Sequence, residues 1–238
     1  MERFEDVART WDASAVPEDA SPAATAVLIR EASGQLEVLM LRRNTKVAFA
    51  GGAWVFPGGR VDEADGAGEH ALGSLEAAAA AARRETAEEA GLDLSETPLE
   101  ILSHWMPPAG TPRRFSTWFF VGAAPLGTVD IDGEEIHDHM WTTAREALAQ
   151  RDAGEVQLAP PTFVTLTSLA RFRAVDEALS TLATEPVEHF VTRILDDEGV
   201  LTALWHGDAA YDADNPAENS EARHRLRMAR DRWQYLRS

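Results

Sequence analysis

The 238-residue sequence contains no cysteine, which excludes disulfide bonds, thiol nucleophiles and cysteine-ligated zinc. Basic residues are also few, since 22 lysines and arginines stand against 40 aspartates and glutamates, a formal net charge of −18. Proteins that bind the phosphate backbone of duplex nucleic acid need a basic surface, so duplex nucleic acid is not an expected partner. No apolar run approaches the roughly 20 residues that span a bilayer, and the N-terminus lacks a signal-peptide pattern. These absences predict a cytoplasmic protein without a membrane partner.

The acidity does not indicate disorder, because 45% of the residues are hydrophobic and can form a core. Residues 1–21 are polar and interrupted by proline, and residues 155–238 contain no linker-like segment. We therefore expect an N-terminal arm at 1–21, an α/β core at 22–154, and a C-terminal extension at 155–238 that packs on the core.

Hydrophobic patterning places the elements. In the core, strands are predicted at 23–29, 36–41, 54–56, 115–123 and 136–141, and helices at 74–91 and 143–150. In the extension, we expect one helix from 160 to about 182, strands near 189–195 and 200–206, and a closing helix from about 220 to 236.

Three glutamates of the 74–91 helix carry the chemical information. Glu85, Glu88 and Glu89 are spaced i, i+3, i+4 and so share one stripe of the helix. In so acidic a chain the plain interpretation is a solvated face. The stripe, however, continues an apolar one through Ala78, Ala81 and Ala82. Carboxylates gathered beside a core are costly unless a cation neutralises them, and oxygen ligands of this kind suit Mg²⁺ or Mn²⁺.

The same segment resembles the Nudix hydrolases, whose box reads Gly, five residues, Glu, seven residues, then Arg-Glu-aliphatic-any-Glu-Glu-any-Gly-aliphatic. The residues in register are Arg84, Glu85, Glu88, Glu89, Gly91 and Leu92, and Glu76 precedes Arg84 by the required seven intervening residues. Thr86 replaces the usual aliphatic residue. The equivalent of the opening glycine is Gly59, with 16 residues before Glu76 instead of five, so the loop is longer by 11 residues.

This resemblance implies a Nudix-type α/β/α sandwich with a mixed β-sheet, followed here by a helical C-terminal extension. It implies that Glu85, Glu88, Glu89 and the backbone carbonyl of Gly59 bind the metal. Arg84 would orient a carboxylate, and Glu88 would take part in catalysis. Glu76 lies on the side of Arg83, so we expect an ion pair there rather than a metal ligand.

A second acidic segment, Asp132-Gly133-Glu134-Glu135, precedes the 136–141 strand. Members of the family often supply a further acid from a downstream loop, and a polar turn is the equally good alternative. If one residue here is a fourth ligand or the general base, we expect Glu135, because it is closer to the strand.

Four arginines are candidates for binding the substrate. Arg113 and Arg114 could hold a phosphate through paired hydrogen bonds, or they could be ordinary strand-end residues. Arg42 and Arg43 precede the glycine turn and leave the same two alternatives open.

Further similarities point to the branch of peroxisomal coenzyme A diphosphatases and their bacterial relatives. They lie at Leu39 to Arg43, Gly52, Phe56 to Gly59, Arg113 to Phe115, Pro160 to Thr162, and Gly207-Asp208. The coenzyme A signature has Thr, a small residue and a second Arg where this chain has Leu41, Asn44 and Ala48, and relatives more often have Asp at Ser116.

The resemblance therefore implies hydrolysis of a diphosphate bond in a nucleoside diphosphate linked to another moiety, with coenzyme A or acyl-coenzyme A as candidates. The alternatives are a Nudix-fold sensor that binds a nucleotide without cleaving it, and an isomerase on the same fold. The C-terminal third either covers the active site or forms a homodimer, and the sequence leaves both open.

Overall fold

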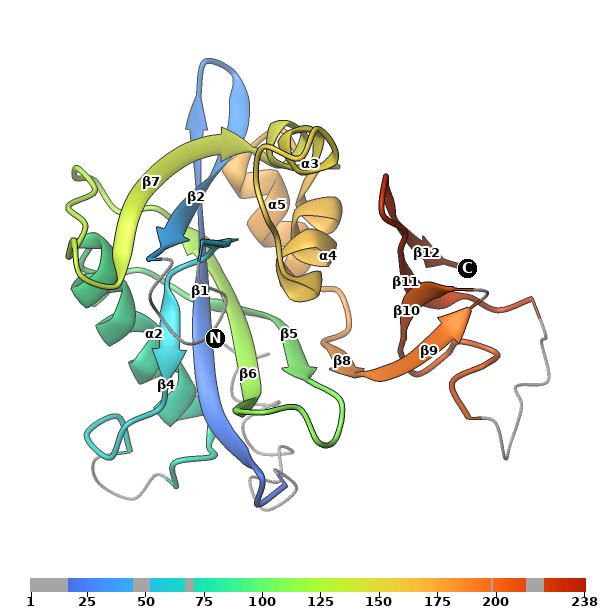
Figure 1. Cartoon of the computed structure of the whole chain (residues 1–238). Coiled ribbons are helices and arrows are strands. Elements are labelled where there is room, and N and C mark those ends of the chain that lie inside the picture. Colours follow the sequence, from blue (N-terminus) through green and yellow to red (C-terminus); the bar gives the residue numbers. More distant parts are fainter. Residues whose placement is uncertain (1–16, 45–51, 67–70, 198, 213–220) are drawn as a thin grey trace.

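The computed structural model describes residues 17–44, 52–66, 71–197, 199–212 and 221–238. The fold is of the α/β class: within these residues, an eight-stranded mixed sheet has one helix on one face and three helices on the other (Figure 1). A smaller four-stranded antiparallel sheet follows at the C-terminal end. No helix in these ranges is long and apolar enough to cross a membrane.

The large sheet is organised around a long hairpin. Strands β1 (Ala20–Ala32) and β2 (Gln35–Arg43) are antiparallel, and β1 runs parallel to β6 (Arg114–Ala123). β2 also pairs with β3 (Trp54–Val55) and β7 (Ile136–Thr143). These strands confirm the predicted ones; β1, β2, β6 and β7 are longer than predicted, and β3 is one residue shorter.

Two strands of the large sheet were not predicted. The three-residue β4 (Gly58–Arg60) pairs with β1, and β5 (Glu100–Met106) lies next to β6. β4 contains two glycines, which are typical of turns rather than strands. In β5, Ser103 and His104 are both buried, so polar residues do not mark an exposed face and the period-2 signal is lost.

The 74–91 helix is confirmed as α2 (Leu75–Ala90). The Ser74 hydroxyl accepts a hydrogen bond from the Ala77 N–H, which caps the first turn. Gly91 ends the helix in the left-handed conformation, with φ 65°. The alanines on one face of α2 are buried against the sheet, and their small side chains let the helix lie close to it. Thr86 is buried as well, and its hydroxyl is satisfied by donating to the Ala82 carbonyl, 2.7 Å away.

The opposite face of the sheet is covered by α3 (Ala144–Asp152), α4 (Pro160–Leu169) and α5 (Val175–Leu182). A capping box of Thr143 and Glu146 starts α3 where the sequence predicted a helix. The single helix expected from 160 to about 182 is wrong in its middle, since residues 170–174 leave the helical conformation and separate α4 from α5.

The extension begins with helices and ends in strands. β8 (Glu188–Val191) pairs in parallel with β5 at the edge of the large sheet. β9 (Arg193–Asp197), β10 (Val200–Leu204), β11 (His224–Met228) and β12 (Trp233–Arg237) form the small sheet. The predicted strand near 200–206 is confirmed as β10, whereas the single strand predicted near 189–195 is divided at Thr192 into β8 and β9, which belong to different sheets.

The closing helix expected from about 220 to 236 is wrong, because this segment forms the hairpin of β11 and β12. Leu226 is buried while its neighbours Arg225 and Arg227 are half-buried, which is the alternation of a strand. Pairing of β11 with β10 satisfies the backbone and decides the structure. The C-terminal extension is therefore helical only in its first part.

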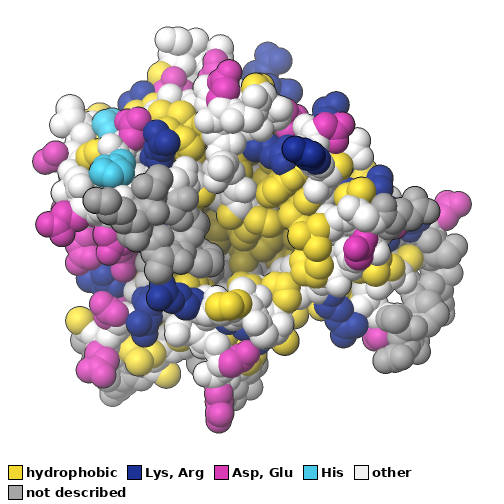
Figure 2. Space-filling model, viewed as in Figure 1, with side chains coloured by type: hydrophobic (Ala, Val, Ile, Leu, Met, Phe, Trp, Pro, Cys, Tyr) yellow, Lys and Arg dark blue, Asp and Glu magenta, His cyan; other side chains and the backbone are white. Residues whose placement is uncertain are grey.

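The small sheet shares the core of the large one. Ala203, Trp205 and Leu226 belong to the hydrophobic cluster that includes Phe163 of α4 and Phe190 of β8. On the face drawn in Figure 2, the molecule is hollowed in the middle, with hydrophobic side chains at the bottom of the hollow and basic side chains on its margin.

Candidate active site

The turn Pro57-Gly58-Gly59 lies directly against α2. The backbone N–H of Gly58 donates a hydrogen bond to Glu89 Oε2 over 2.9 Å. A Cβ atom placed on Gly59 would lie 2.3 Å from Glu85 Oε1, so a glycine is required for the carboxylate to approach this closely. The predicted juxtaposition of Gly59 with the helix glutamates is present in the structure.

Burial sets the electrostatics of two of the three glutamates. Glu89 is 4% exposed, and this burial raises its pKa to about 8 although the Gly58 N–H and Arg43 act in the opposite direction. Burial also raises the pKa of Glu85, against the effect of Arg84. The charge of Glu85 also raises the pKa of Glu89, which indicates that the two carboxylates lie close together. Two carboxyls of raised pKa at one place are typical of functional sites.

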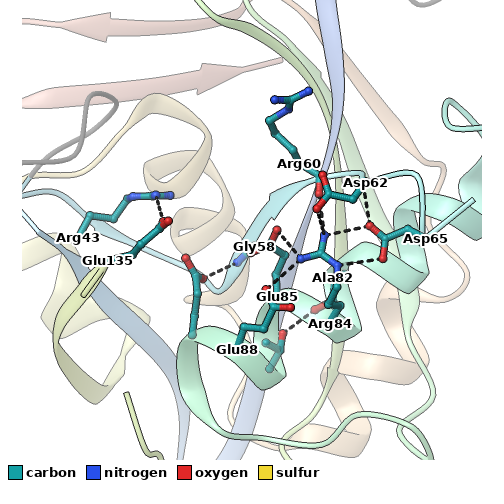
Figure 3. A network of polar contacts seen from close by, with 12 residues as sticks. Arg43, Gly58, Arg60, Asp62, Asp65, Ala82, Arg84, Glu85, Glu88 and Glu135 are labelled. Carbon is teal, nitrogen blue, oxygen red and sulfur yellow. Dashed lines mark hydrogen bonds and ion pairs between the residues drawn. The ribbon is translucent and has the colours of Figure 1, made fainter. Parts of the chain in front are cut away.

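Glu88 differs from these two because its side chain is 59% exposed. Arg84 Nη1 lies between Glu88 and Glu85, 3.0 Å from Glu88 Oε2 and 2.9 Å from Glu85 Oε1 (Figure 3). The orienting role predicted for Arg84 therefore has a geometric basis, since one nitrogen fixes one oxygen of each carboxylate.

Asp65 is a site residue that the sequence did not single out. It lies in the long loop between β4 and α2, and its carboxylate binds Arg84 by two hydrogen bonds, Nε to Oδ1 at 3.1 Å and Nη2 to Oδ2 at 2.9 Å. Burial raises the pKa of Asp65, but the hydrogen bonds from Arg84 and the Asp62 N–H outweigh burial and lower it. No sequence signal separates Asp65 from its acidic neighbours Asp62 and Glu63.

Glu135 reaches the same site from the segment before β7. Its carboxylate forms an ion pair of 2.9 Å with Arg43, and its charge raises the pKa of both Glu85 and Glu89. Asp132 has a different role, because its Oδ1 accepts the N–H groups of Glu134, Glu135 and Ile136 and so closes the turn. The segment therefore has features of both alternatives. Asp132 forms a polar turn, and this turn places Glu135 near the glutamates of α2.

The four candidate arginines are not brought together. Arg43 lies at the acidic cluster, defined here as Glu85, Glu88, Glu89 and Glu135, and its buried Nε has no hydrogen-bond partner within the described residues. Arg42 is exposed, and its backbone pairs with Trp54 and Asp138.

Arg113 and Arg114 lie at the start of β6, at the level of Ala20, whereas Gly59 pairs with Ala24. Four residues of strand separate the two levels by about 13 Å. Arg113 is exposed, with φ 53°. Arg114 is buried and contacts the Asp19 carboxylate at 3.0 Å and the Pro107 carbonyl at 2.8 Å.

The positions that differ from the coenzyme A signature also have defined surroundings. Leu41 is fully buried in β2, and the Asn44 side chain donates to the Glu134 carbonyl over 2.9 Å. Ser116 is buried with its hydroxyl 2.8 Å from Nε2 of His104. Ala48 lies outside the described residues. Arg83, the expected partner of Glu76, donates to the backbone carbonyls of Leu94 and Thr97.

The chemistry of the acidic cluster fits a hard divalent cation, since it offers carboxylate oxygens and, from Gly59, a backbone carbonyl. The buried Glu85 and Glu89 are also the kind of groups that a cation would stabilise in the charged form. Among the described residues no three acidic or histidine side chains already converge in metal-binding geometry, and Arg84 binds both Glu85 and Glu88.

Comparisons with known proteins agree with this geometry. The NUDIX domain model matches residues 20–161. A curated relative from Caenorhabditis elegans, named as nudix hydrolase 7, is 26% identical over 222 residues, which cover 75% of this chain and 70% of the relative. Among solved structures, a NUDIX hydrolase from Alicyclobacillus acidocaldarius superposes with a TM-score of 0.61 at 29% identity, covering 70% of this chain and 98% of that one.

Proposed function

The chain belongs to the Nudix hydrolases, enzymes that generally cleave nucleoside diphosphate derivatives with divalent cations such as Mg²⁺ or Mn²⁺, and we propose that its own substrate is a nucleoside diphosphate linked to another moiety. Water would attack one phosphorus of the diphosphate, breaking a P–O bond and leaving two phosphate-bearing products.

The observation that carries the proposal is the contact between the Gly58-Gly59 turn and the α2 glutamates. Glu85 and Glu89 lie against this turn with raised pKa values, and Glu88 and Glu135 border it on the exposed side. A surface helix with a merely solvated acidic face would not bury a carboxylate to 4% exposure. We therefore assign Glu85, Glu88, Glu89 and the Gly59 carbonyl as the residues that hold Mg²⁺ or Mn²⁺.

When bound, such a cation neutralises charge on the diphosphate and makes the attacking water more acidic. Glu135 is assigned as the general base because its carboxylate is exposed to solvent and borders Glu85 and Glu89. Arg84 holds Glu85 and Glu88 in place, and Arg43 is assigned to the substrate phosphate because its Nε is buried beside the cluster and unpaired among the described residues.

We propose coenzyme A and acyl-coenzyme A as the first candidate substrates. The resemblance at residues 39–43, 56–59, 113–115 and 160–162 supports this choice. The signature positions occupied by Leu41 and Ser116 are buried in the core, so they do not contribute substrate contacts here. Recognition of the adenosine phosphates would then rest on Arg43 and Arg113 in this chain.

The test is a panel of coenzyme A, acyl-coenzyme A and other nucleoside diphosphate derivatives, incubated with the protein and Mg²⁺ or Mn²⁺, with products identified by mass. We expect cation-dependent release of two phosphate-bearing products from at least one member. Binding of a member without turnover would refute hydrolysis and favour the sensor. Turnover of other members but not of the coenzyme A derivatives would refute only the choice of coenzyme A as the substrate.

A further inference from the structure

We propose that Asp65, in the long loop between β4 and α2, is a positioning residue that fixes the Arg84 guanidinium and through it the carboxylates of Glu85 and Glu88. This inference rests on the proposed function, because it assigns a purpose to Arg84 within that site. It goes beyond the Nudix box, since the loop that carries Asp65 is the segment in which this chain is longer than the box.

Every donor of Arg84 has a partner in the structure. A guanidinium carries five N–H groups in a rigid plane. Nε and one N–H of Nη2 bind Asp65, and the other N–H of Nη2 binds the Arg60 carbonyl at 2.9 Å. The two N–H groups of Nη1 bind Glu85 and Glu88. Because the plane is rigid, the side bound by Asp65 and Arg60 determines where Nη1 lies (Figure 3).

Asp65 is itself held in place by its loop. Its N–H donates to the Asp62 carbonyl at 3.0 Å, and its Oδ2 accepts the Asp62 N–H at 2.8 Å, so residues 62–65 form a closed turn. The Asp65 side chain is only 4% exposed, whereas that of Asp62 is 64% exposed and lies 3.9 Å from Arg84 Nη2. Of these two acids, Asp65 alone is fixed, buried and bidentate.

The charge of Asp65 has a direct consequence for cation binding. Arg84 is a permanent positive charge beside carboxylates that must also bind a divalent cation. Asp65 supplies a counter-charge on the far side of the guanidinium, so Arg84 does not depend on Glu85 and Glu88 for neutralisation. Without it, Arg84 would bind these two glutamates more strongly and compete with the cation. Loss of Asp65 should therefore weaken metal binding before any substrate is present.

The experiment measures Mn²⁺ binding to the substrate-free protein by calorimetry and paramagnetic resonance, at a temperature at which circular dichroism shows each variant to be folded. We expect Asp65→Asn to raise the Mn²⁺ dissociation constant about 10- to 100-fold, the scale of losing a partner of the metal-binding groups. Turnover should fall by a similar factor through kcat, with little change in KM. The matched control is Asp62→Asn in the same turn, which should bind Mn²⁺ as the wild type does.

A double-mutant cycle separates positioning from general support of the loop. In an Arg84→Gln background, Asp65→Asn should have no further effect on Mn²⁺ binding, because Asp65 acts through Arg84. Asp65→Glu keeps the carboxylate and should bind Mn²⁺ more tightly than Asp65→Asn. Wild-type Mn²⁺ affinity in Asp65→Asn, an undiminished effect in the Arg84→Gln background, or no rescue by Asp65→Glu would each overturn the inference.

The two proposals fail in different ways. A wild-type protein that neither binds Mn²⁺ nor cleaves any member of the substrate panel would refute the proposed function. A wild-type protein that does both, while Asp65→Asn equals it, would refute only the role of Asp65.

Discussion

Glu89 accepts a hydrogen bond from the backbone N–H of Gly58, 31 residues earlier in the chain, and this bond joins the end of α2 to the start of β4. A buried carboxylate on the helix thereby meets two glycines, which have no side chains. This contact brings the glutamates of α2 to the glycine turn, and the first three predictions address the site formed there.

Glu88→Gln should lower kcat at least about 100-fold, the scale of losing a major electrostatic contact in the transition state. The side chain is nearly isosteric and 59% exposed, so the fold should be retained. Turnover is measured at saturating Mg²⁺ or Mn²⁺, with Glu63→Gln in the exposed loop as the control. Wild-type turnover by Glu88→Gln would refute the assignment of Glu88 to the metal.

Gly58 and Gly59 should respond differently to alanine. At Gly59 the three atoms nearest to the new Cβ all belong to the Glu85 carboxylate, which can rotate away, so Gly59→Ala should lose turnover with little loss of stability. At Gly58 the Cβ would lie 2.3 Å from the Ala24 carbonyl oxygen and 2.7 Å from the Thr25 Cα. That backbone cannot give way easily, so Gly58→Ala should lower the free energy of unfolding by about 1–3 kcal/mol. Urea unfolding and turnover are measured for both variants. Equal losses of stability in Gly58→Ala and Gly59→Ala would contradict this prediction.

The stability of the metal-free protein should fall as pH rises, because of Glu89. Its pKa is raised from 4.5 to about 8 in the folded state, so the folded protein binds this proton more tightly than the unfolded chain does. The stabilisation is complete below the unfolded pKa and is lost as pH rises towards 8. Urea midpoints measured in chelator from pH 5 to 8.5 should show the decline, and Glu89→Gln should reduce it. An identical decline in the variant would show that other groups cause it.

Asp208→Asn should destabilise the protein by about 3–5 kcal/mol, the scale of breaking a buried ion pair from one side. Asp208 is buried and binds Arg225 by two hydrogen bonds of 2.6 and 2.7 Å, tying the turn after β10 to β11. Burial raises the pKa of Asp208, but the hydrogen bonds from Arg225, Ala210 and His224 outweigh it and lower it. The stability that ionised Asp208 contributes is therefore present at neutral pH and is lost as pH falls through the pKa of Asp208 in the folded protein.

Urea unfolding of Asp208→Asn at pH 7 measures this loss, with the exposed Asp212→Asn as the control. If Asp208→Asn unfolds at the same urea concentration as the control, the buried pair does not hold the small sheet in place.

Several features of the fold follow from local pattern alone. Ser74 and Gly91 mark the two ends of α2, and the spacing of Glu85, Glu88 and Glu89 places them on one stripe whatever the surroundings. The sequence therefore determined the helix, its acidic stripe and the likeness to the Nudix box. The hairpin of β1 and β2 is local in the same sense, since Ser33 and Gly34 turn the chain between two apolar runs.

Other features depend on contacts between distant segments, and only the tertiary structure decided them. The segment 224–237 contains no local signal that outweighs a helix, and it became a hairpin because β10 offers its backbone for pairing. From the sequence, Arg114 and Arg43 were equally good candidates for a phosphate ligand. In the structure Arg114 binds Asp19 and the Pro107 carbonyl, whereas Arg43 forms an ion pair with Glu135 at the acidic cluster. Asp65 is one of several acids in its loop, and its role exists only because the loop folds back over Arg84. The spacing of residues along one helix or strand determines which side chains share a face. The burial and the hydrogen-bond partners of those side chains depend on the elements packed against them, and these set the charge state and the chemistry of the site.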